Sequence, residues 1–141
     1  MIEGRCHCGN IAYTLTWEPP PDTIAARACD CGFCTRHGAL WTSNPAGLLT
    51  LTIRDGNRLT RYAFETRTAD FLICSTCGVA PAVVSRIDER DYAVVNVNTF
   101  VSFPVSRIRR APVSLGDEDE RVRLDRRRRG WIADVRIRIA S

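Results

Sequence analysis

The sequence has no lysine and no long hydrophobic run. All 20 basic residues among its 141 are arginines. No apolar stretch approaches the roughly 20 residues that a membrane-spanning helix needs, and the first residues lack the apolar segment of a secretory signal. We therefore expect no membrane partner, and we expect the reducing cytoplasm as the location.

The sequence also does not have an even number of cysteines. The seven cysteines stand in three groups, and an odd number does not suit a framework of disulfides. In a reducing compartment, clustered cysteines are typical of metal sites or catalytic thiols. The groups are Cys6 with Cys8, Cys29 with Cys31 and Cys34, and Cys74 with Cys77.

Charge is unevenly distributed near the C-terminus, although the formal net charge of the chain is only +4. Within residues 116–130, the acidic stretch GDEDE precedes the arginine-rich stretch RLDRRRRG. Neighbouring runs of opposite sign usually form a solvated loop that compensates its own charge, and we expect such a loop here. A nucleic-acid surface is disfavoured, because the sequence shows no basic helix and no basic strip with interleaved aromatic residues.

The hydrophobic pattern predicts a mainly β fold with little helix. Residues 10–17 alternate, with the apolar side chains of Ile11, Tyr13, Leu15 and Trp17 on one face. Further extended segments are predicted at residues 23–28, 38–43, 69–74, 91–100 and 131–139, and as two runs within 48–64 around a turn at Asp55-Gly56. We interpret residues 1–141 as a single zinc-binding domain, with a charged extension at about 107–130 before the last strand.

The spacing of the cysteines predicts zinc. Cys74 and Cys77 are separated by two residues and followed by glycine, as in zinc knuckles, where a tight turn directs both sulfurs to one point. Cys6 and Cys8 are separated by one residue and are also followed by glycine. These two pairs can close a four-cysteine site. The remaining three cysteines then suggest a second zinc with an open fourth position, although spacing alone does not fix which pair joins which.

Three other arrangements stay open at this point. His37, three residues after Cys34, could complete a closed site of three cysteines and one histidine. His7 could be a ligand instead of a surface side chain. A single four-cysteine site could also leave three free thiols.

Four stretches within residues 4–100 carry a resemblance to a known family. GRCHCGNIAYTL, CDCGFCTRHGAL, FLICSTCGVAP and YAVVNVNTF resemble the successive motifs of the glutathione-dependent formaldehyde-activating enzyme family, which includes centromere protein V-like members. The resemblance implies a β-tent fold in which His37 is not a ligand. It also implies a structural zinc held by Cys6, Cys8, Cys74 and Cys77 and a catalytic zinc held by Cys29, Cys31 and Cys34. Residues 107–141 are longer and more charged than the usual ending of the family.

The family's reaction joins glutathione and formaldehyde to give S-hydroxymethylglutathione, and it is classed in reverse as a carbon–sulfur lyase reaction. The resemblance thus implies two zinc ions per chain, and a small thiol such as glutathione and an aldehyde as partners. A thiol entering the open position of a zinc site loses its proton readily. Because three thiolates weaken the Lewis acidity of zinc, we favour this thiol-holding role over polarisation of the aldehyde.

Candidate substrate contacts are less specific than the cysteines. The residues that could line the open site are Arg36, Trp41 and Asn96, and the arginines that could pair with substrate carboxylates are Arg27, Arg36, Arg61 and Arg67. The alternative function is a zinc-stabilised module that binds protein or nucleic acid without catalysis. An exchangeable fourth position inside a concave pocket would distinguish the enzyme from the module.

Overall fold

The structure is a computed structural model that describes residues 1–140; Ser141, the last residue of the predicted domain, lies outside the described residues. The predicted mainly β fold with little helix is confirmed. The helices are α1 (Gly32–His37) and α2 (Glu120–Gly130), with short 3-10 helices η1 (Gly56–Arg58), η2 (Val97–Thr99) and η3 (Val105–Arg107). The strands are β1 (Ile2–Arg5), β2 (Ile11–Thr16), β3 (Ile24–Cys29), β4 (Trp41–Thr42), β5 (Leu48–Ile53), β6 (Leu59–Tyr62), β7 (Asp70–Cys74), β8 (Ala82–Ile87), β9 (Arg90–Asn96), β10 (Ile108–Val113) and β11 (Asp134–Ile139).

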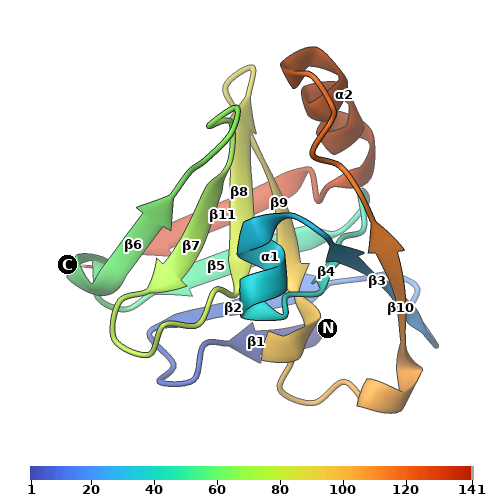
Figure 1. Ribbon diagram of the computed structural model, residues 1–141. Helices are drawn as coiled ribbons and strands as arrows, with labels where there is room; N and C mark the ends of the chain where they lie inside the picture. Colours follow the sequence, from blue (N-terminus) through green and yellow to red (C-terminus); the bar gives the residue numbers. More distant parts are fainter. Residues whose placement is uncertain (141) are drawn as a thin grey trace.

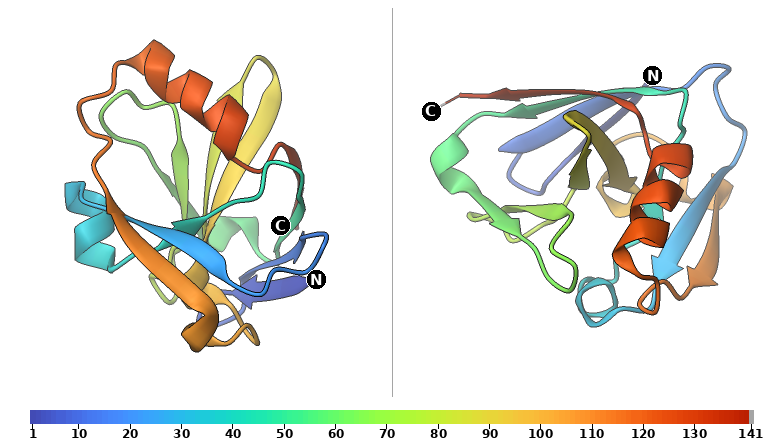
Figure 2. Two further views of the ribbon diagram at one scale, coloured as in Figure 1. Left: turned by 90° about the vertical axis from the view of Figure 1, so that its right-hand side faces the viewer. Right: turned by 90° about the horizontal axis from the view of Figure 1, so that it is seen from above.

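These strands form two sheets. The smaller sheet has the order β1-β2-β5-β11, and the larger has the order β10-β3-β4-β9-β8-β7-β6 (Figure 1). Seen from above, β5 and β11 run along one side of a roughly triangular outline, and the two ends of the larger sheet form the other two sides (Figure 2). The larger sheet therefore bends sharply, and α2 lies inside the bend, between the β8–β9 hairpin and β3 (Figure 2).

The main apolar core lies between the two sheets. The alternation predicted for residues 10–17 is present, since Ile11, Tyr13 and Leu15 of β2 are buried in this core. The larger sheet contributes alternate residues of its central strands, such as Val84 and Val95. Burial of these faces supplies most of the stabilisation that holds the sheets together.

The opposite face of the larger sheet is also buried. Val83 of β8 and Val94 of β9 point away from the main core and form a second cluster with Trp41 and Trp131. Strands buried on both faces consist of nearly continuous apolar residues and lack alternation. This explains why β8 was not predicted from the sequence, which shows no period of two over Ala82–Ile87.

The C-terminal region corrects one prediction. Residues 116–130 are not a solvated loop throughout, because Glu120–Gly130 forms α2, which is rich in arginine. Asp119 is the N-cap residue of this helix, and its side chain accepts a hydrogen bond of 2.9 Å from the Val122 N–H. The expected absence of a basic helix is therefore wrong as well.

The same region is integrated into both sheets. β10 pairs in parallel with β3, and β11 pairs in parallel with β5. The last strand begins at Asp134 and not at Trp131, although Ile132 makes an isolated bridge to Ala93 of β9. Within residues 1–140, no helix has both the length and the apolar character needed to span a membrane.

The two extended runs around Asp55-Gly56 also exist, as β5 and β6, but they do not pair with each other. β5 belongs to the smaller sheet and β6 to the larger one. Between them, η1 begins after Asp55, whose side chain accepts a hydrogen bond of 2.9 Å from the Asn57 N–H. The chain therefore crosses from one sheet to the other at this turn. Besides β8, the strands β1 and β10 were not predicted.

Candidate metal centres

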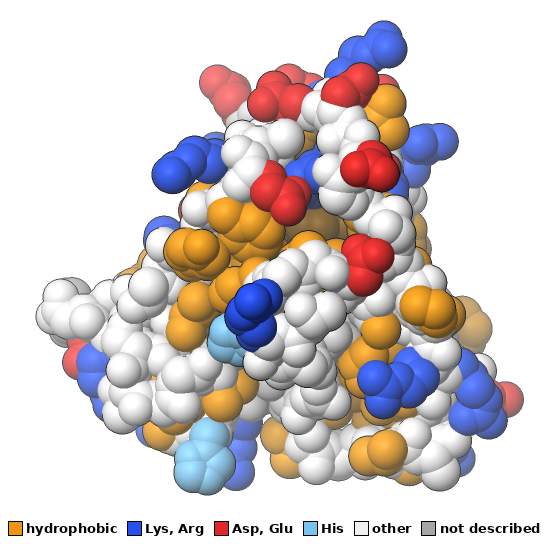
Figure 3. All heavy atoms as spheres, viewed as in Figure 1, with side chains coloured by type: hydrophobic (Ala, Val, Ile, Leu, Met, Phe, Trp, Pro, Cys, Tyr) orange, Lys and Arg blue, Asp and Glu red, His pale blue; other side chains and the backbone are white. Residues whose placement is uncertain are grey.

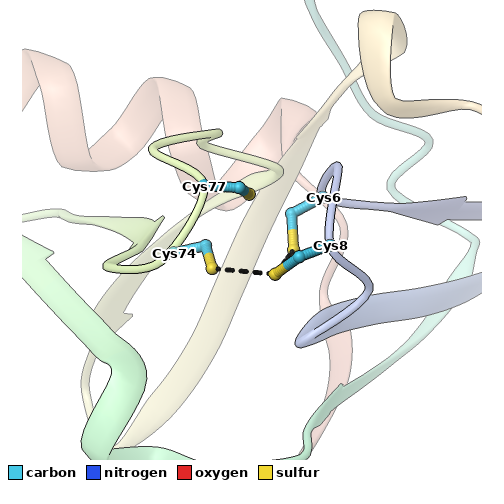
Figure 4. Close-up of side chains that lie close together, drawn as sticks. All are labelled: Cys6, Cys8, Cys74 and Cys77. Atoms are coloured by element: carbon cyan, nitrogen blue, oxygen red, sulfur yellow. Dashed lines mark hydrogen bonds between the residues drawn. The ribbon is translucent and has the colours of Figure 1, made fainter.

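Four cysteines from two turns, one on each sheet, come together. Cys6 and Cys8 lie in the turn after β1, whereas Cys74 ends β7 and Cys77 lies in the turn before β8. Figure 4 shows the four sulfurs pointing toward one another from these two turns. The pairs are far apart in the sequence and belong to different sheets, so a shared ligand set would connect the sheets directly.

The distances between these sulfurs fit a tetrahedral zinc site. Zinc–sulfur bonds of about 2.3 Å place the sulfurs of a regular tetrahedron about 3.8 Å apart. The Sγ atoms of Cys6 and Cys8 are 3.8 Å apart, those of Cys8 and Cys74 are 3.4 Å apart, and all four lie within 4.8 Å of one another. The donor set is the one that structural zinc prefers, and the four side chains need little rearrangement to hold the ion.

Two similar turns position these sulfurs. Gly9 and Gly78 both have positive φ, 86° and 81°, and their N–H groups donate to the carbonyls of Cys6 and Cys74 at 3.1 and 2.8 Å. The Cys6 N–H donates to the Ile11 carbonyl at 2.8 Å. The glycines that follow both cysteine pairs therefore have the structural role that the sequence indicated.

Burial and hydrogen bonds shift the thiol pKa values of this cluster in opposite directions. Burial raises the pKa of Cys6 to about 11. Burial also raises the pKa of Cys77, but hydrogen bonds, first from the Val79 N–H and then from the Cys8 N–H, outweigh it and lower the pKa to about 6. Backbone N–H groups aimed at a sulfur stabilise the thiolate, which is the form that binds metal.

The other three cysteines form a second group. Cys29 is the last residue of β3, Cys31 precedes α1 as its N-cap residue, and Cys34 lies inside α1. Their Sγ atoms lie within 4.8 Å of one another. Cys34 is buried, whereas Cys29 and Cys31 are half-buried and partly accessible. Because the group supplies three thiol ligands, a zinc ion there would have a fourth position to fill.

N–H groups of the backbone and of an indole ring reach the sulfurs of this three-cysteine cluster. The Cys34 N–H donates to the Cys31 Sγ at 3.4 Å, and the indole Nε1–H of Trp41 donates to the Cys34 Sγ at 3.3 Å. The hydrogen bond between the thiols of Cys34 and Cys29 lowers the pKa of Cys29 to about 6 and raises the pKa of Cys34. A thiolate is thus stabilised in the cluster near neutral pH.

Neither histidine joins a cysteine cluster. Among the His, Cys, Asp and Glu side chains of residues 1–140, only the cysteines come together in the two groups. The ring of His37 stacks on Phe33 with 4.4 Å between the ring centroids. The closed site of three cysteines and one histidine is therefore not formed.

A cavity of about 100 Å³ lies beside the three-cysteine cluster. Its walls include apolar side chains from the second cluster of the core, and Figure 3 shows a hollow with a hydrophobic floor and charged side chains around its rim. All three cysteines line it. The fourth position of a metal at this cluster would therefore be reached from inside a concave, largely apolar space.

The residues predicted to line this site divide into two sets. Trp41 and Arg27 line the cavity. Asn96 does not; it is buried and its Nδ2–H donates to the Ala80 carbonyl at 3.2 Å. Three exposed arginines do not line it either, namely Arg36, Arg61 and Arg67.

The contribution of the C-terminal region to this cavity was not predicted from the sequence. Arg123, Arg126 and Arg127 of α2 line it together with Trp131. Arg123 and Arg127 are each only 7% exposed. Their spacing of four residues was the available signal, because residues four apart lie on the same face of a helix.

Two comparisons relate the chain to known proteins. It matches the family described as glutathione-dependent formaldehyde-activating enzyme over residues 1–110. A crystal structure of a Rhodobacter sphaeroides protein, solved as a structural genomics target, is similar with a TM-score of 0.54 and 31% sequence identity, over 74% of this chain and 92% of that chain. No curated protein matches the chain. All seven cysteines lie within the matched segment, whereas α2 and β11 lie beyond it.

Proposed function

The chain belongs to the family of glutathione-dependent formaldehyde-activating enzymes, and on that premise we propose that it is a zinc-dependent enzyme of the carbon–sulfur lyase type. It joins a small thiol, such as glutathione, to an aldehyde, such as formaldehyde. The observation that carries the proposal is the position of the three-cysteine cluster, which lines a concave cavity with all three thiols.

The two cysteine clusters have different roles in this proposal. Cys6, Cys8, Cys74 and Cys77 hold a structural zinc, because four thiolates complete its coordination. Cys29, Cys31 and Cys34 hold the catalytic zinc, because three ligands leave one position for substrate. Zinc held there would lower the pKa of an incoming thiol, so that its sulfur is present as a nucleophilic thiolate at neutral pH.

The reaction consumes only the thiol and the aldehyde. The thiol loses its proton and its sulfur forms a bond to the carbonyl carbon of the aldehyde. The π electron pair of the C=O bond moves to the oxygen, which takes up a proton to give the hydroxymethyl thioether. In the reverse direction the carbon–sulfur bond breaks, which is the lyase reaction.

Side chains around the cavity favour this step through their effects on a metal ligand and on water. The Trp41 N–H donates to the Cys34 sulfur, which orients that ligand and stabilises its thiolate form. Apolar side chains such as Phe64, Phe71 and Trp131 exclude water from the walls. In such a dry environment, interactions between fixed charges and the reacting groups are stronger than in bulk water.

The non-catalytic binding module is the less favoured function. A module stabilised by zinc needs a closed ligand set at each metal, but the second cluster has three cysteines with no histidine beside them. Its position in a cavity supports a small ligand more than a flat macromolecular interface.

We also propose that residues 1–141 work as one zinc-binding domain in the cytoplasm. β11 pairs with β5 and β10 pairs with β3, so the C-terminal region contributes to both sheets. All seven cysteines are free thiols, and thiolate ligands persist where the surroundings are reducing.

The proposal is tested by exchange spectroscopy on the zinc-loaded protein. NMR with ¹³C-labelled formaldehyde and glutathione measures the rate at which formaldehyde exchanges with its S-hydroxymethyl adduct. We expect the wild-type protein to accelerate this exchange and Cys31→Ala to abolish the acceleration, because the substitution removes a ligand of the catalytic zinc.

The control for this experiment is Arg36→Ala on the same helix. Arg36 is exposed and its side chain bonds to the Gly32 carbonyl, so its loss is expected to leave the rate unchanged. A wild-type protein with zinc in both clusters that exchanges formaldehyde no faster than Cys31→Ala would refute the proposed function.

A further inference from the structure

Positive charge is in excess around the cavity. Four arginines line it, namely Arg27, Arg123, Arg126 and Arg127. Arg123 forms an ion pair of 3.0 Å with Glu65, and Arg126 binds Glu118 at 2.9 Å. Within residues 1–140, neither Arg27 nor Arg127 forms an ion pair with a carboxylate, so two of the four charges lack a counterion.

Arg127 is the more deeply buried of these two arginines. It is 7% exposed, and its guanidinium lies over the Trp131 ring with 4.9 Å from Cζ to the ring centroid. Nη1 donates to the hydroxyls of Thr68 at 2.8 Å and Ser85 at 3.0 Å. These contacts fix the plane of the guanidinium and occupy one end of it.

The opposite edge of the same guanidinium has no hydrogen-bond acceptor among residues 1–140. Nε of Arg127 is buried and unpartnered, and no hydrogen bond from Nη2 is formed within that range. The neighbouring Arg126 uses this edge to bind a carboxylate, since its Nε and Nη2 reach Glu118 at 3.0 and 2.9 Å. The edge that Arg127 leaves unused is thus the one that binds a carboxylate in a bidentate manner.

Arg27 brings a second charge to the same space. It lies two residues before Cys29 on β3, so both side chains leave the strand on the same face. Its register partner Trp41 also lines the cavity. The only side-chain hydrogen bond of Arg27 within residues 1–140 is from Nη2 to the Ser43 hydroxyl, at 3.0 Å.

Burying a cation without a counterion is costly, and proteins compensate such charges with an ion pair or a ligand. We propose that Arg127, assisted by Arg27, forms a subsite for the carboxylate of an anionic thiol whose sulfur enters the three-cysteine site. This inference rests on the proposed function and names the side chains that would select thiols with a carboxylate over neutral thiols. The deeper arginine comes from α2, beyond the segment that matches the family, so the subsite is a feature of this chain's C-terminal region.

Another role for these charges is electrostatic support of the metal centre. Zinc with three thiolates carries a net negative charge, and two arginines could offset it at a distance. The two roles predict different behaviour toward ligands. A carboxylate subsite discriminates between anionic and neutral thiols, whereas general support of the centre affects both kinds of thiol equally.

The experiment compares 3-mercaptopropionate with 2-mercaptoethanol, which are small thiols with and without a carboxylate. Binding to the zinc-loaded protein is measured by titration calorimetry. We expect 3-mercaptopropionate to bind the wild-type protein about tenfold or more tightly than 2-mercaptoethanol, as a charge-assisted hydrogen-bonded pair should provide. Arg127→Gln should remove this preference and leave the affinity for 2-mercaptoethanol unchanged.

Two matched variants accompany Arg127→Gln. Arg127→Lys keeps the charge but not the bidentate edge, so it should restore part of the preference. Arg121→Gln removes the same charge from an exposed position of α2 and should keep the full preference. Because Arg127 also bonds to Thr68 and Ser85, the zinc content of each variant is measured to confirm that the site is intact.

Failure of the carboxylate subsite and failure of the proposed function would give different binding results. Equal affinity of the wild-type protein for both thiols, or an equal loss of both in Arg127→Gln, would overturn the carboxylate subsite and leave the proposed function standing. If neither thiol binds a protein with zinc in both clusters, the proposed function fails and the inference fails with it.

Discussion

At the scale of single residues, Trp41 connects the apolar interior to the three-cysteine cluster. Its ring is buried in the second cluster of the core, while its Nε1–H donates to the Cys34 sulfur at 3.3 Å. Hydrogen bonds to ligand atoms orient the ligands and tune the charge they donate, and their loss typically reduces metal affinity. Trp41 therefore affects the metal without binding it.

We expect Trp41→Phe to weaken zinc binding at the three-cysteine cluster by about 10- to 100-fold. Phenylalanine keeps an aromatic ring in the core but has no N–H group to donate. The measurement is competition for zinc with a chromophoric chelator. The four-cysteine site is the internal control, because the Trp41 N–H donates to a sulfur of the other cluster and the affinity of the four-cysteine site should not change. An unchanged zinc affinity of the three-cysteine cluster in Trp41→Phe would contradict this role.

The residues of the site differ in how far the sequence predicted them. The cysteines could be divided into three local groups from their spacing, because short turns bring near neighbours together whatever the rest of the fold does. That the first and last of these groups join in one four-cysteine cluster was an inference that spacing alone did not fix. Arg27 could be named but not separated from Arg36, Arg61 and Arg67, since only the strand register decides which arginine faces the cavity. Arg127 was not predicted, because its position depends on a helix that the sequence analysis interpreted as a loop.

At the scale of elements, α2 is a helix that buries arginine. Helices are recognised by an apolar stripe with a period of 3.6 residues. The buried residues of α2 are Arg123 and Arg127, so its inward face is charged and the stripe is missing. The face is stabilised by ion pairs and hydrogen bonds, which leave no signal in a hydropathy pattern.

Arg123 anchors this helix. Its Nη1 donates to Glu65 at 3.0 Å, and its Nη2 donates to the Leu115 carbonyl at 3.0 Å. We expect Arg123→Met to lower the free energy of unfolding by about 1–3 kcal/mol, because hydrogen bonds of a buried charged group are lost while the apolar stem is kept. Urea denaturation of the zinc-loaded protein measures this change.

The matched control is Arg121→Met, which replaces an exposed arginine on the same helix. Its effect should stay within about 0.5 kcal/mol, as is usual for surface substitutions. If the two variants unfold at the same urea concentration, α2 is not anchored through Arg123.

At the scale of the whole molecule, the two cysteine clusters differ in their position relative to the two sheets. The four-cysteine cluster joins a turn of the smaller sheet to a turn of the larger one. The bend of the larger sheet creates the space that α2 partly covers, and the three-cysteine cluster lines the cavity there (Figure 2). One metal position would therefore hold the fold together, while the other would be accessible to a ligand.

This arrangement could be predicted from the sequence only in part. The mainly β class followed from the alternation in strands such as β2 and β11, each of which has one face directed at the core. The assignment of β5 and β6 to different sheets did not follow, because a turn such as that at Asp55 has the same local form whether or not its strands pair.

The zinc content per chain of freshly purified, reduced protein tests the two-cluster arrangement most directly, when elemental analysis measures it for the wild type and for Cys31→Ala. We expect two zinc ions in the wild type, one for each cluster, and one in a still-folded Cys31→Ala. A single zinc ion that Cys31→Ala leaves unchanged, with no further uptake when zinc is added to the wild type, would contradict the claim that the three-cysteine cluster is a metal site.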